Sequence, residues 1–315
     1  MTEGDETRSY RAQQWTVPQL VRKKGPARVS VVLPARNEAA TVGGIVQRLL
    51  ADLADLACGV PLIDELVVID SDSDDDTAAV ATAAGARVVA ASSIRPDWGA
   101  YPGKGEALWK SLFVTTGDLL VFVDADLTEW GPHFVTGLLG PLLSDPTLML
   151  VKGHYHRHFD SVTAAQTGDV GGRVTELVAR PMLALNWPEL AFVVQPLAGE
   201  WAIRREAVEL LSMPVGYGVD LAALIDTAAV FGADTIAQVD LGSRAHRHHG
   251  HLELGAMALQ VMAAAEGRLS GTAPREESVP LTQFVRGPHG PKPRTRQVLV
   301  AERPPAASVE GYRTR

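Results

Sequence analysis

The sequence lacks the features that mark secreted and membrane proteins. Its one cysteine, Cys58, cannot form a disulfide within the chain, and such low cysteine usage fits a compartment that keeps thiols reduced. No apolar run approaches the roughly 20 residues that a membrane-spanning helix needs. The first residues, MTEGDETRSYRAQQW, are polar and contain no signal-peptide core. We therefore expect a cytoplasmic protein with no membrane segment.

The sequence also has fewer basic than acidic residues. The chain of 315 residues has 29 lysines and arginines against 37 aspartates and glutamates, which gives a formal net charge of −8. An acidic surface repels a phosphate backbone, so we expect no nucleic-acid partner. Apolar residues make up 46% of the chain, and a chain of this length can bury the core of one large domain or two small ones.

Short apolar runs alternate with helical patterns in the first half of the chain. The runs that read as strands are 29–33, 66–69, 86–90 and 118–126. This alternation predicts an α/β fold whose parallel sheet is covered by helices on both faces. Ligands of such sheets bind beyond the carboxyl ends of the strands. Because the polar clusters 36–38, 71–76 and 124–126 all follow strands, we expect them to converge on one cleft.

The second half is less regular, and four parts can be distinguished along the chain. Strands are expected at 148–156 and 238–248, and helices at 171–185, 218–232 and 252–267. From about Arg286 the sequence is rich in proline and basic residues, which predicts an extended or partly disordered tail. The four expected parts are a polar N-terminal arm (1–27), a first half (28–150), a second half (151–285) and the tail (286–315).

Two aspartates follow the apolar run of LLVFVDADLTEW, residues 119–130. Asp124 and Asp126 are one residue apart, and like charges so close to a buried strand are costly unless something compensates them. Either water solvates the turn or a cation binds there. Mg²⁺ and Mn²⁺ take carboxylate oxygens and keep coordination positions for substrate phosphates.

The order of several longer segments resembles a known family. SVVLPARNEAATVGGIV, VVIDSDSDDDT, PGKGEALWKSL and VFVDADL resemble the nucleotide-sugar half of a GT-A glycosyltransferase. GGRVTELVARPML, QPLAGEWAIRRE, GYGVDLAALIDT, IAQVDLGSRAHRH and LGAMALQV are similar to segments of the glucosyl-3-phosphoglycerate synthase family, retaining enzymes of actinobacteria. The similarity spans about residues 28–285, with every segment in the family's order.

The resemblance implies a fold, a reaction and an assembly. The fold would be GT-A, with a Rossmann-like mixed sheet, helices on both faces and a helical C-terminal acceptor portion. Glucose would pass from UDP-glucose, or another nucleotide-glucose, to the 2-hydroxyl of D-3-phosphoglycerate, with Mg²⁺ or Mn²⁺ as the divalent cation. The first half would bind the nucleotide sugar and the second half the acceptor, and the protein would be a homodimer.

The resemblance also assigns the donor and metal sites to particular residues. Asp126 and His246 would hold the cation, because a neutral imidazole is an acceptable ligand beside carboxylate and phosphate oxygens. A zinc site or a simple polar loop is the alternative interpretation of the His-rich run around His246. The donor would be bound by Pro34, Ala35, Arg36, Glu38, Ser71, Lys104, Asp124, Ala125 and Met257.

Lys104 lies between two glycines, which would let the backbone pass close to a phosphate while the ammonium reaches the diphosphate. A surface lysine is the alternative. The resemblance places Arg244 against the same diphosphate, and it places Tyr217 and Asp220 against the transferred sugar or the acceptor. These four residues are the catalytic candidates.

Gly172, Arg173 and Thr175 match the family's acceptor-phosphate site. A Gly-Gly turn that opens a helix offers free backbone N–H groups and the positive end of the helix dipole. The guanidinium of Arg173 adds a fork of donors, and Thr175 adds a hydroxyl. An ordinary helix start with an exposed arginine is the alternative interpretation.

The sequence departs from the family pattern at a few of these positions. Asp220 stands where the family has Glu, Trp201 where it has Tyr, and Arg36 where it has an apolar residue. His248 and His249 replace residues that are Asn and Arg in the family. These departures leave open a relative with another sugar donor or another phosphorylated or carboxylated acceptor. A nucleotide-sugar-binding protein without activity is the remaining alternative.

Overall fold

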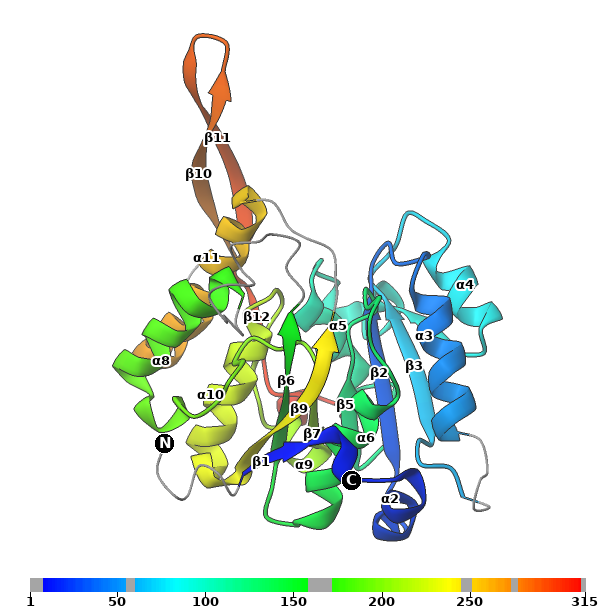
Figure 1. Ribbon diagram of the computed structural model, residues 1–315. Coiled ribbons are helices and arrows are strands. Elements are labelled where there is room, and N and C mark those ends of the chain that lie inside the picture. Colours follow the sequence, from blue (N-terminus) through cyan, green and yellow to red (C-terminus); the bar gives the residue numbers. More distant parts are fainter. Residues whose placement is uncertain (1–7, 55–59, 158–171, 245–250, 273–276, 313–315) are drawn as a thin grey trace.

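The computed structural model describes residues 8–54, 60–157, 172–244, 251–272 and 277–312. An eight-stranded sheet forms its centre, in the strand order β1-β9-β6-β7-β5-β2-β3-β4 (Figure 1). The bounds of these strands are β1 Ser9–Arg11, β2 Val29–Ala35, β3 Glu65–Asp70, β4 Arg87–Ala90, β5 Leu119–Phe122, β6 Leu150–Arg157, β7 Trp201–Arg204 and β9 Ile236–Arg244. Strand β7 is antiparallel to both of its neighbours, and the other adjacent strands run parallel. The predicted mixed sheet is therefore confirmed.

Helices cover both faces of the sheet, as predicted. Side chains alternate along each strand, so Val31 and Leu33 of β2 pack in the core on one face and Val32 packs in the core on the other. The helices on the first face are α2 (Val17–Lys24), α3 (Val42–Leu49), α4 (Thr77–Ala83) and α6 (His133–Ser144). Those on the second are α5 (Lys104–Ser111), α8 (Arg180–Asn186), α9 (Arg205–Val208), α10 (Val219–Phe231) and α11 (His251–Ser270).

Strand β7 was not expected from the sequence, and its direction matters for the site. It lies between β5 and β6, with Trp201 directly opposite both Phe122 and Lys152. Because β7 runs against these neighbours, it begins at the edge of the sheet where β5 ends. The segment before it, residues 197–200, is thereby brought to the turn that carries Asp124 and Asp126.

The N-terminal arm differs from the expected polar arm. Residues 9–11 form β1 at the edge of the sheet, and α2 buries Leu20 completely. The Lys24 ammonium lies 2.6 Å from a carboxylate oxygen of Asp64, which ties the end of α2 to the loop before β3. The part of the expected arm that the structure describes is thus integrated into the domain.

The expected tail is also ordered into strands. A hairpin of β10 (Ser278–Gly287) and β11 (Gly290–Leu299) projects from the body (Figure 1). Prolines are tolerated there because each strand of a two-stranded ribbon has an outer edge, where a missing N–H breaks no ladder bond.

After the hairpin, the chain returns to the body of the molecule. Strand β12 (Glu302–Arg303) pairs with β8 (Met213–Pro214). The buried Arg303 guanidinium makes two 2.7 Å hydrogen bonds to the carboxylate of Glu106 in α5. None of the helices in the described part of the chain combines the length and apolar character that a bilayer crossing requires.

Candidate active site

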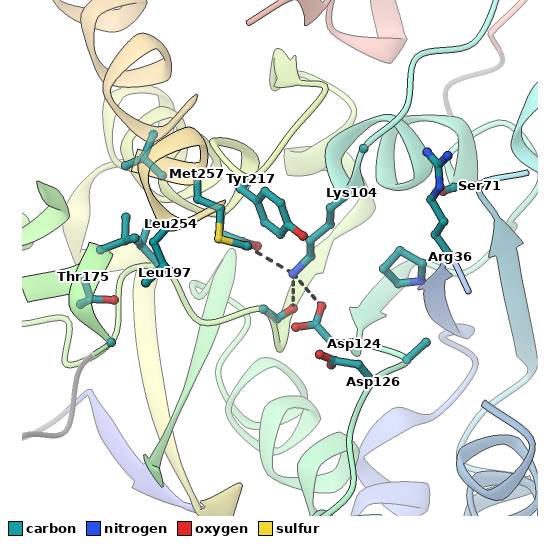
Figure 2. Close-up of a pocket in the computed structure, with 18 of the residues that line it drawn as sticks. Arg36, Ser71, Lys104, Asp124, Asp126, Thr175, Leu197, Tyr217, Leu254 and Met257 are labelled. Carbon is teal, nitrogen blue, oxygen red and sulfur yellow. Dashed lines mark hydrogen bonds and ion pairs between the residues drawn. The ribbon is translucent and has the colours of Figure 1, made fainter. Parts of the chain in front are cut away.

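The carboxyl ends of β2, β3 and β5 meet at one pocket of about 330 Å³. In Figure 2, Arg36 and Ser71 lie at one end of this pocket, Thr175, Leu197 and Leu254 lie at the other, and Lys104 and Asp124 lie between them. The predicted convergence on one cleft is confirmed. The predicted site residues that line the pocket are Pro34, Ala35, Arg36, Glu38, Ser71, Lys104, Asp124, Ala125, Asp126, Gly172, Arg173, Thr175, Tyr217, Asp220 and Met257.

For two predicted site residues, the structure does not describe the side chain. The backbone of Arg244 ends β9 and pairs with that of Arg157. His246 lies outside the described residues, as do His248 and His249. Their predicted roles at the diphosphate and the cation stay predictions.

Hydrogen bonds tie the three strand-end loops to one another. The Thr41 hydroxyl donates to the carbonyl of Ala125, between the two aspartates, at 2.6 Å. The backbone N–H of Glu38 donates to the Thr77 hydroxyl at 2.7 Å, and that of Ser71 donates to the carbonyl of Ala35 at 2.8 Å. The donor side of the pocket is therefore a linked set of loops whose relative positions are fixed.

The acidic loop after β3 satisfies much of its own charge. Asp70 accepts a 2.5 Å hydrogen bond from the Ser73 hydroxyl, and Asp75 accepts from the hydroxyl and the backbone N–H of Thr77. The Thr77 hydroxyl is the main cause that lowers the pKa of Asp75 below its usual value. This loop fits the interpretation as a self-contained acidic turn from which Ser71 alone lines the pocket.

A single ammonium lies at the centre of the pocket. The Nζ atom of Lys104 is 2.7 Å from Oδ1 of Asp124 and 3.3 Å from Oδ2 of Asp220. Burial lowers the pKa of Lys104, but the carboxylates of Asp124, Asp220 and Glu200 more than offset it and leave the pKa raised above its usual value. The side chain is only 10% exposed. The alternative of a surface lysine is therefore wrong.

The glycines beside Lys104 have a structural reason that differs from the predicted one. A Cβ on Gly103 would lie 2.3 Å from the carbonyl oxygen of Val215, and one on Gly105 would lie 1.8 Å from that of Pro214. Gly103 also has φ +145°, which disfavours other residues. The start of α5 thus packs directly on protein backbone, and this contact fixes the direction of the Lys104 side chain.

Gly199 is a pocket residue that sequence reasoning missed. A Cβ on it would lie 2.1 Å from Oδ2 of Asp124 and 2.6 Å from Nζ of Lys104. The carbonyl oxygen of Gly199 is 3.3 Å from the same Nζ. The glycine lets the ion pair lie against the backbone before β7, and a side chain here would displace the ends of Asp124 and Lys104. The only sequence signal is its place in the segment QPLAGEWAIRRE.

A second buried lysine lies beneath the pocket and was also missed. Lys152 on β6 is fully buried, and its Nζ donates to the carbonyl of Ala198 at 2.8 Å. Burial lowers its pKa to about 8, against the opposing effect of the nearby Asp220 carboxylate. The indole of Trp201 donates to Asp220, with Nε1 3.0 Å from Oδ1. Because Lys104 contacts the other oxygen of the same carboxylate, Asp220 is held from two sides.

The other end of the pocket combines polar and apolar groups. Thr175 is buried at the start of the helical turn η5 (Thr175–Ala179), whereas Arg173 is exposed, with Nη1 3.2 Å from Nε2 of His251. Three apolar side chains of α11 at helical spacing line the pocket wall: Leu254, Met257 and Val261. His251 is a further polar neighbour that the sequence analysis did not single out.

Tyr217 lines the pocket between its two ends. Burial and then the Asp124 carboxylate are the main causes that raise the pKa of its hydroxyl, while Lys104 acts in the opposite sense. The hydroxyl therefore stays protonated at neutral pH and can donate a hydrogen bond to a ligand.

The chemistry of the pocket fits a hard divalent cation. Asp126 and Asp124 present carboxylate oxygens at the end of β5, and Lys104 pairs with Asp124. Among the residues that the structure describes, no three His, Cys, Asp or Glu side chains form a metal cluster. The described part contributes Asp126 as the predicted protein ligand, which suits a cation that shares its coordination with a substrate phosphate.

Comparison with known proteins identifies similar enzymes. The sequence model of Glycosyl transferase family 2 matches residues 30–209. The glucosyl-3-phosphoglycerate synthase of Mycolicibacterium smegmatis is 46% identical over 301 residues, which cover 96% of this chain and 96% of that enzyme.

Crystal structures of the Mycobacterium tuberculosis glucosyl-3-phosphoglycerate synthase are similar over most of the chain. The complex with Mn²⁺, UDP-glucose and phosphoglyceric acid has a TM-score of 0.80 at 45% identity, covering 93% of this chain and 95% of that one. The complex with Mg²⁺ and UDP has a TM-score of 0.81 at 44% identity, covering 95% of this chain and 98% of that one. These matches confirm the predicted GT-A fold.

The buried Lys152 predicts a specific dependence of stability on pH. Its folded-state pKa of about 8 lies below the usual 10.5, so between these values the unfolded chain binds a proton that the folded chain does not. The free energy of unfolding should therefore rise with pH in this window. We compare the free energy of unfolding of wild type with that of Lys152→Met. The difference, wild type minus variant, should rise by on the order of 2 kcal/mol from pH 7.5 to pH 10.

Urea unfolding of both proteins at intervals of pH measures this difference. Lys292→Met, which alters an exposed lysine of the hairpin, is the matched control and should follow the wild-type curve. Parallel curves for wild type and Lys152→Met would show that Lys152 is charged in the folded protein over the whole range.

Proposed function

Because the chain belongs to glycosyltransferase family 2, and within it to the glucosyl-3-phosphoglycerate synthases, we propose that it transfers glucose from UDP-glucose to the 2-hydroxyl of D-3-phosphoglycerate. The products are UDP and glucosyl-3-phosphoglycerate, with retained configuration at the anomeric carbon. The observation that carries the proposal is a single pocket with donor-type residues at one end and a phosphate-type site at the other, with Lys104 between them.

The first half of the chain supplies the donor end. Pro34, Ala35, Arg36, Glu38 and Ser71 bind the uridine part in this proposal, and their loops are fixed by the hydrogen bonds between strand ends. This division supports a nucleotide-sugar half at 28–150 and an acceptor half at 151–285.

The centre of the pocket binds the diphosphate of the donor in this proposal. Lys104, with its raised pKa, brings a permanent positive charge beside Asp124, and Arg244 adds a second cation. Asp126 and His246 hold Mg²⁺ or Mn²⁺, which neutralises negative charge on the diphosphate when bound. The M. tuberculosis enzyme carries Mn²⁺ with UDP-glucose and Mg²⁺ with UDP in the structures compared above.

The second half supplies the acceptor end. Gly172, Arg173 and Thr175 bind the phosphate of 3-phosphoglycerate, and the acceptor's 2-hydroxyl then points toward the sugar. The bond from the anomeric carbon to the UDP oxygen breaks, and the bond to the acceptor oxygen forms on the same face. The leaving phosphate takes the proton of the 2-hydroxyl, while Tyr217 and Asp220 bind the sugar.

We also propose a homodimer in the cytoplasm. The projecting hairpin has one unpaired edge on each strand within the described part of the chain, and Phe284 on it is 66% exposed. An exposed ribbon of this kind suits a symmetric contact with a second copy. The single cysteine supports the compartment, which fractionation of cells that express the protein would test.

The assignment of Asp126 as a metal ligand predicts a specific loss of activity. Asp126→Ala should abolish UDP release from UDP-glucose in the presence of 3-phosphoglycerate, and excess EDTA should do the same to wild type, because the diphosphate charge is then uncompensated. The melting temperature of Asp126→Ala should stay near that of wild type. Asp74→Ala, which removes an exposed carboxylate of the neighbouring acidic loop, should remain active. Full activity of Asp126→Ala would contradict the assignment.

The acceptor site predicts a change confined to one substrate. Charge-assisted hydrogen bonds from Arg173 to a phosphate are worth about 1.5–3 kcal/mol each, so Arg173→Ala should raise the KM for 3-phosphoglycerate by roughly ten- to a hundredfold. UDP affinity should hardly change. Arg173→Lys should restore only part of the loss, because an ammonium cannot make two parallel hydrogen bonds.

Steady-state kinetics with varied acceptor measures this effect. Arg180→Ala is the control, since Arg180 lies further along the same helical segment and pairs with Glu176. If both Arg173 variants had the wild-type KM for 3-phosphoglycerate, the proposal that Arg173 binds the acceptor phosphate would be wrong.

The proposed homodimer predicts the mass of the protein in solution. Light scattering at micromolar concentration should give about twice the 33.6 kDa of one chain. A mass of one chain at that concentration would contradict the homodimer.

A further inference from the structure

We propose that Trp201 is a positioning residue of the transferase, whose indole N–H holds the Asp220 carboxylate in the orientation that the donor sugar requires. This inference rests on the proposed function, because it assigns Asp220 to the sugar. Nε1 of Trp201 is 3.0 Å from Oδ1 of Asp220, and Oδ2 of the same carboxylate faces Lys104 at 3.3 Å. Asp220 lines the pocket, whereas Trp201 is fully buried, so Trp201 acts on the substrate through Asp220.

The indole is a donor whose direction is fixed by the sheet. On β7, Trp201 lies directly opposite Phe122 of β5 and Lys152 of β6, and directly opposed residues project from the same face. The Phe122 ring lies 4.5 Å from the Trp201 ring between centroids, and Nζ of Lys152 lies 5.7 Å from the Trp201 ring centroid. Three strands thus set where the N–H points, and α10 brings Asp220 to it.

The indole N–H matters because two carboxylates compete for one ammonium. Lys104 is closer to Asp124, at 2.7 Å, than to Asp220, at 3.3 Å. The indole holds one oxygen of Asp220, so this carboxylate cannot turn both oxygens toward Lys104. Without the N–H, Asp220 would be free to rotate onto Lys104 and leave the orientation that the donor sugar requires, while Lys104 stays paired with Asp124. The consequence would fall on the donor sugar and the chemical step, and the UDP part of the donor would bind as before.

A second buried tryptophan in this chain provides a matched control. Trp109 is also fully buried, its Nε1 donates one 2.8 Å hydrogen bond to the carbonyl of Pro304, and its ring packs 4.7 Å from that of Phe113. Trp201→Phe and Trp109→Phe each remove one buried indole hydrogen bond and keep an aromatic ring. Their melting temperatures should fall by similar amounts. A difference in kinetics between the two variants therefore reflects where the lost hydrogen bond lies in the protein and not a loss of stability.

The first measurement is kinetic. Trp201→Phe should lower kcat/KM for UDP-glucose by roughly ten- to a hundredfold, as expected when a reacting group is displaced by a fraction of an ångström to one ångström. The KM for 3-phosphoglycerate and the Kd of UDP should stay within about threefold of wild type, and Trp109→Phe should leave all three values within that margin. Trp201→Tyr, which restores a donor on the ring, should recover part of the loss.

The second measurement tests whether the effect passes through Asp220. In the background of Asp220→Ala, Trp201→Phe should change kcat/KM by less than about twofold, because the hydrogen-bond acceptor that it orients is already gone. Equal, additive losses in both backgrounds would overturn the proposal. So would a Trp201→Phe enzyme with wild-type kinetics, or a Trp109→Phe enzyme with the same loss.

Binding without acceptor separates this proposal from the proposed function. Calorimetry should show that Trp201→Phe weakens UDP-glucose relative to UDP, whereas Trp109→Phe leaves the ratio of the two affinities unchanged. This ratio does not involve 3-phosphoglycerate. If wild type released no UDP with 3-phosphoglycerate but the ratio changed as expected, the acceptor would be wrong and the role of Trp201 would stand. An unchanged ratio would overturn the role of Trp201, whatever the acceptor.

Discussion

The Lys104 ammonium lies between an oxygen of Asp124, at the end of β5, and an oxygen of Asp220, in the first turn of α10. These two contacts join the sheet edge that carries the donor residues to the helix that bounds the other part of the pocket. Without the ammonium, Asp124, Asp220 and the fully buried Glu200 would repel one another in a largely buried site. A Cβ on Gly103 or Gly105 would collide with the backbone of Val215 or Pro214, and one on Gly199 would displace the ends of the Lys104 and Asp124 side chains.

The position of Lys104 depends in turn on the C-terminal segment. Strand β12 pairs with β8, and the carbonyl of Val215 just after β8 accepts from the N–H of Glu106 in α5. Arg303 in β12 makes two hydrogen bonds to the carboxylate of Glu106 in the first turn of α5. Helix α5 is thereby held from its buried side.

Much of the site could be predicted from the sequence because parallel strands end at the same edge of a sheet. That rule was sufficient to bring the clusters after β2, β3 and β5 together. It could not reveal β7, a four-residue strand whose direction depends on its neighbours, or the close approach of Gly199 to the Asp124 side chain, 75 residues earlier. The Pro-rich hairpin was missed because composition alone does not show that two strands have free outer edges. Asp220 and Trp201 were noted separately as departures from the family pattern, and only the structure shows that they are hydrogen-bonded.

In the proposed reaction, this pocket brings a nucleotide sugar and a phosphorylated acceptor together around Lys104. UDP release from UDP-glucose, followed with 3-phosphoglycerate, with unphosphorylated glycerate and with no acceptor, tests it most directly. UDP release should be rapid with 3-phosphoglycerate, much slower with glycerate and almost absent without an acceptor. Equal rates with glycerate and 3-phosphoglycerate, or release that does not depend on an acceptor, would contradict it.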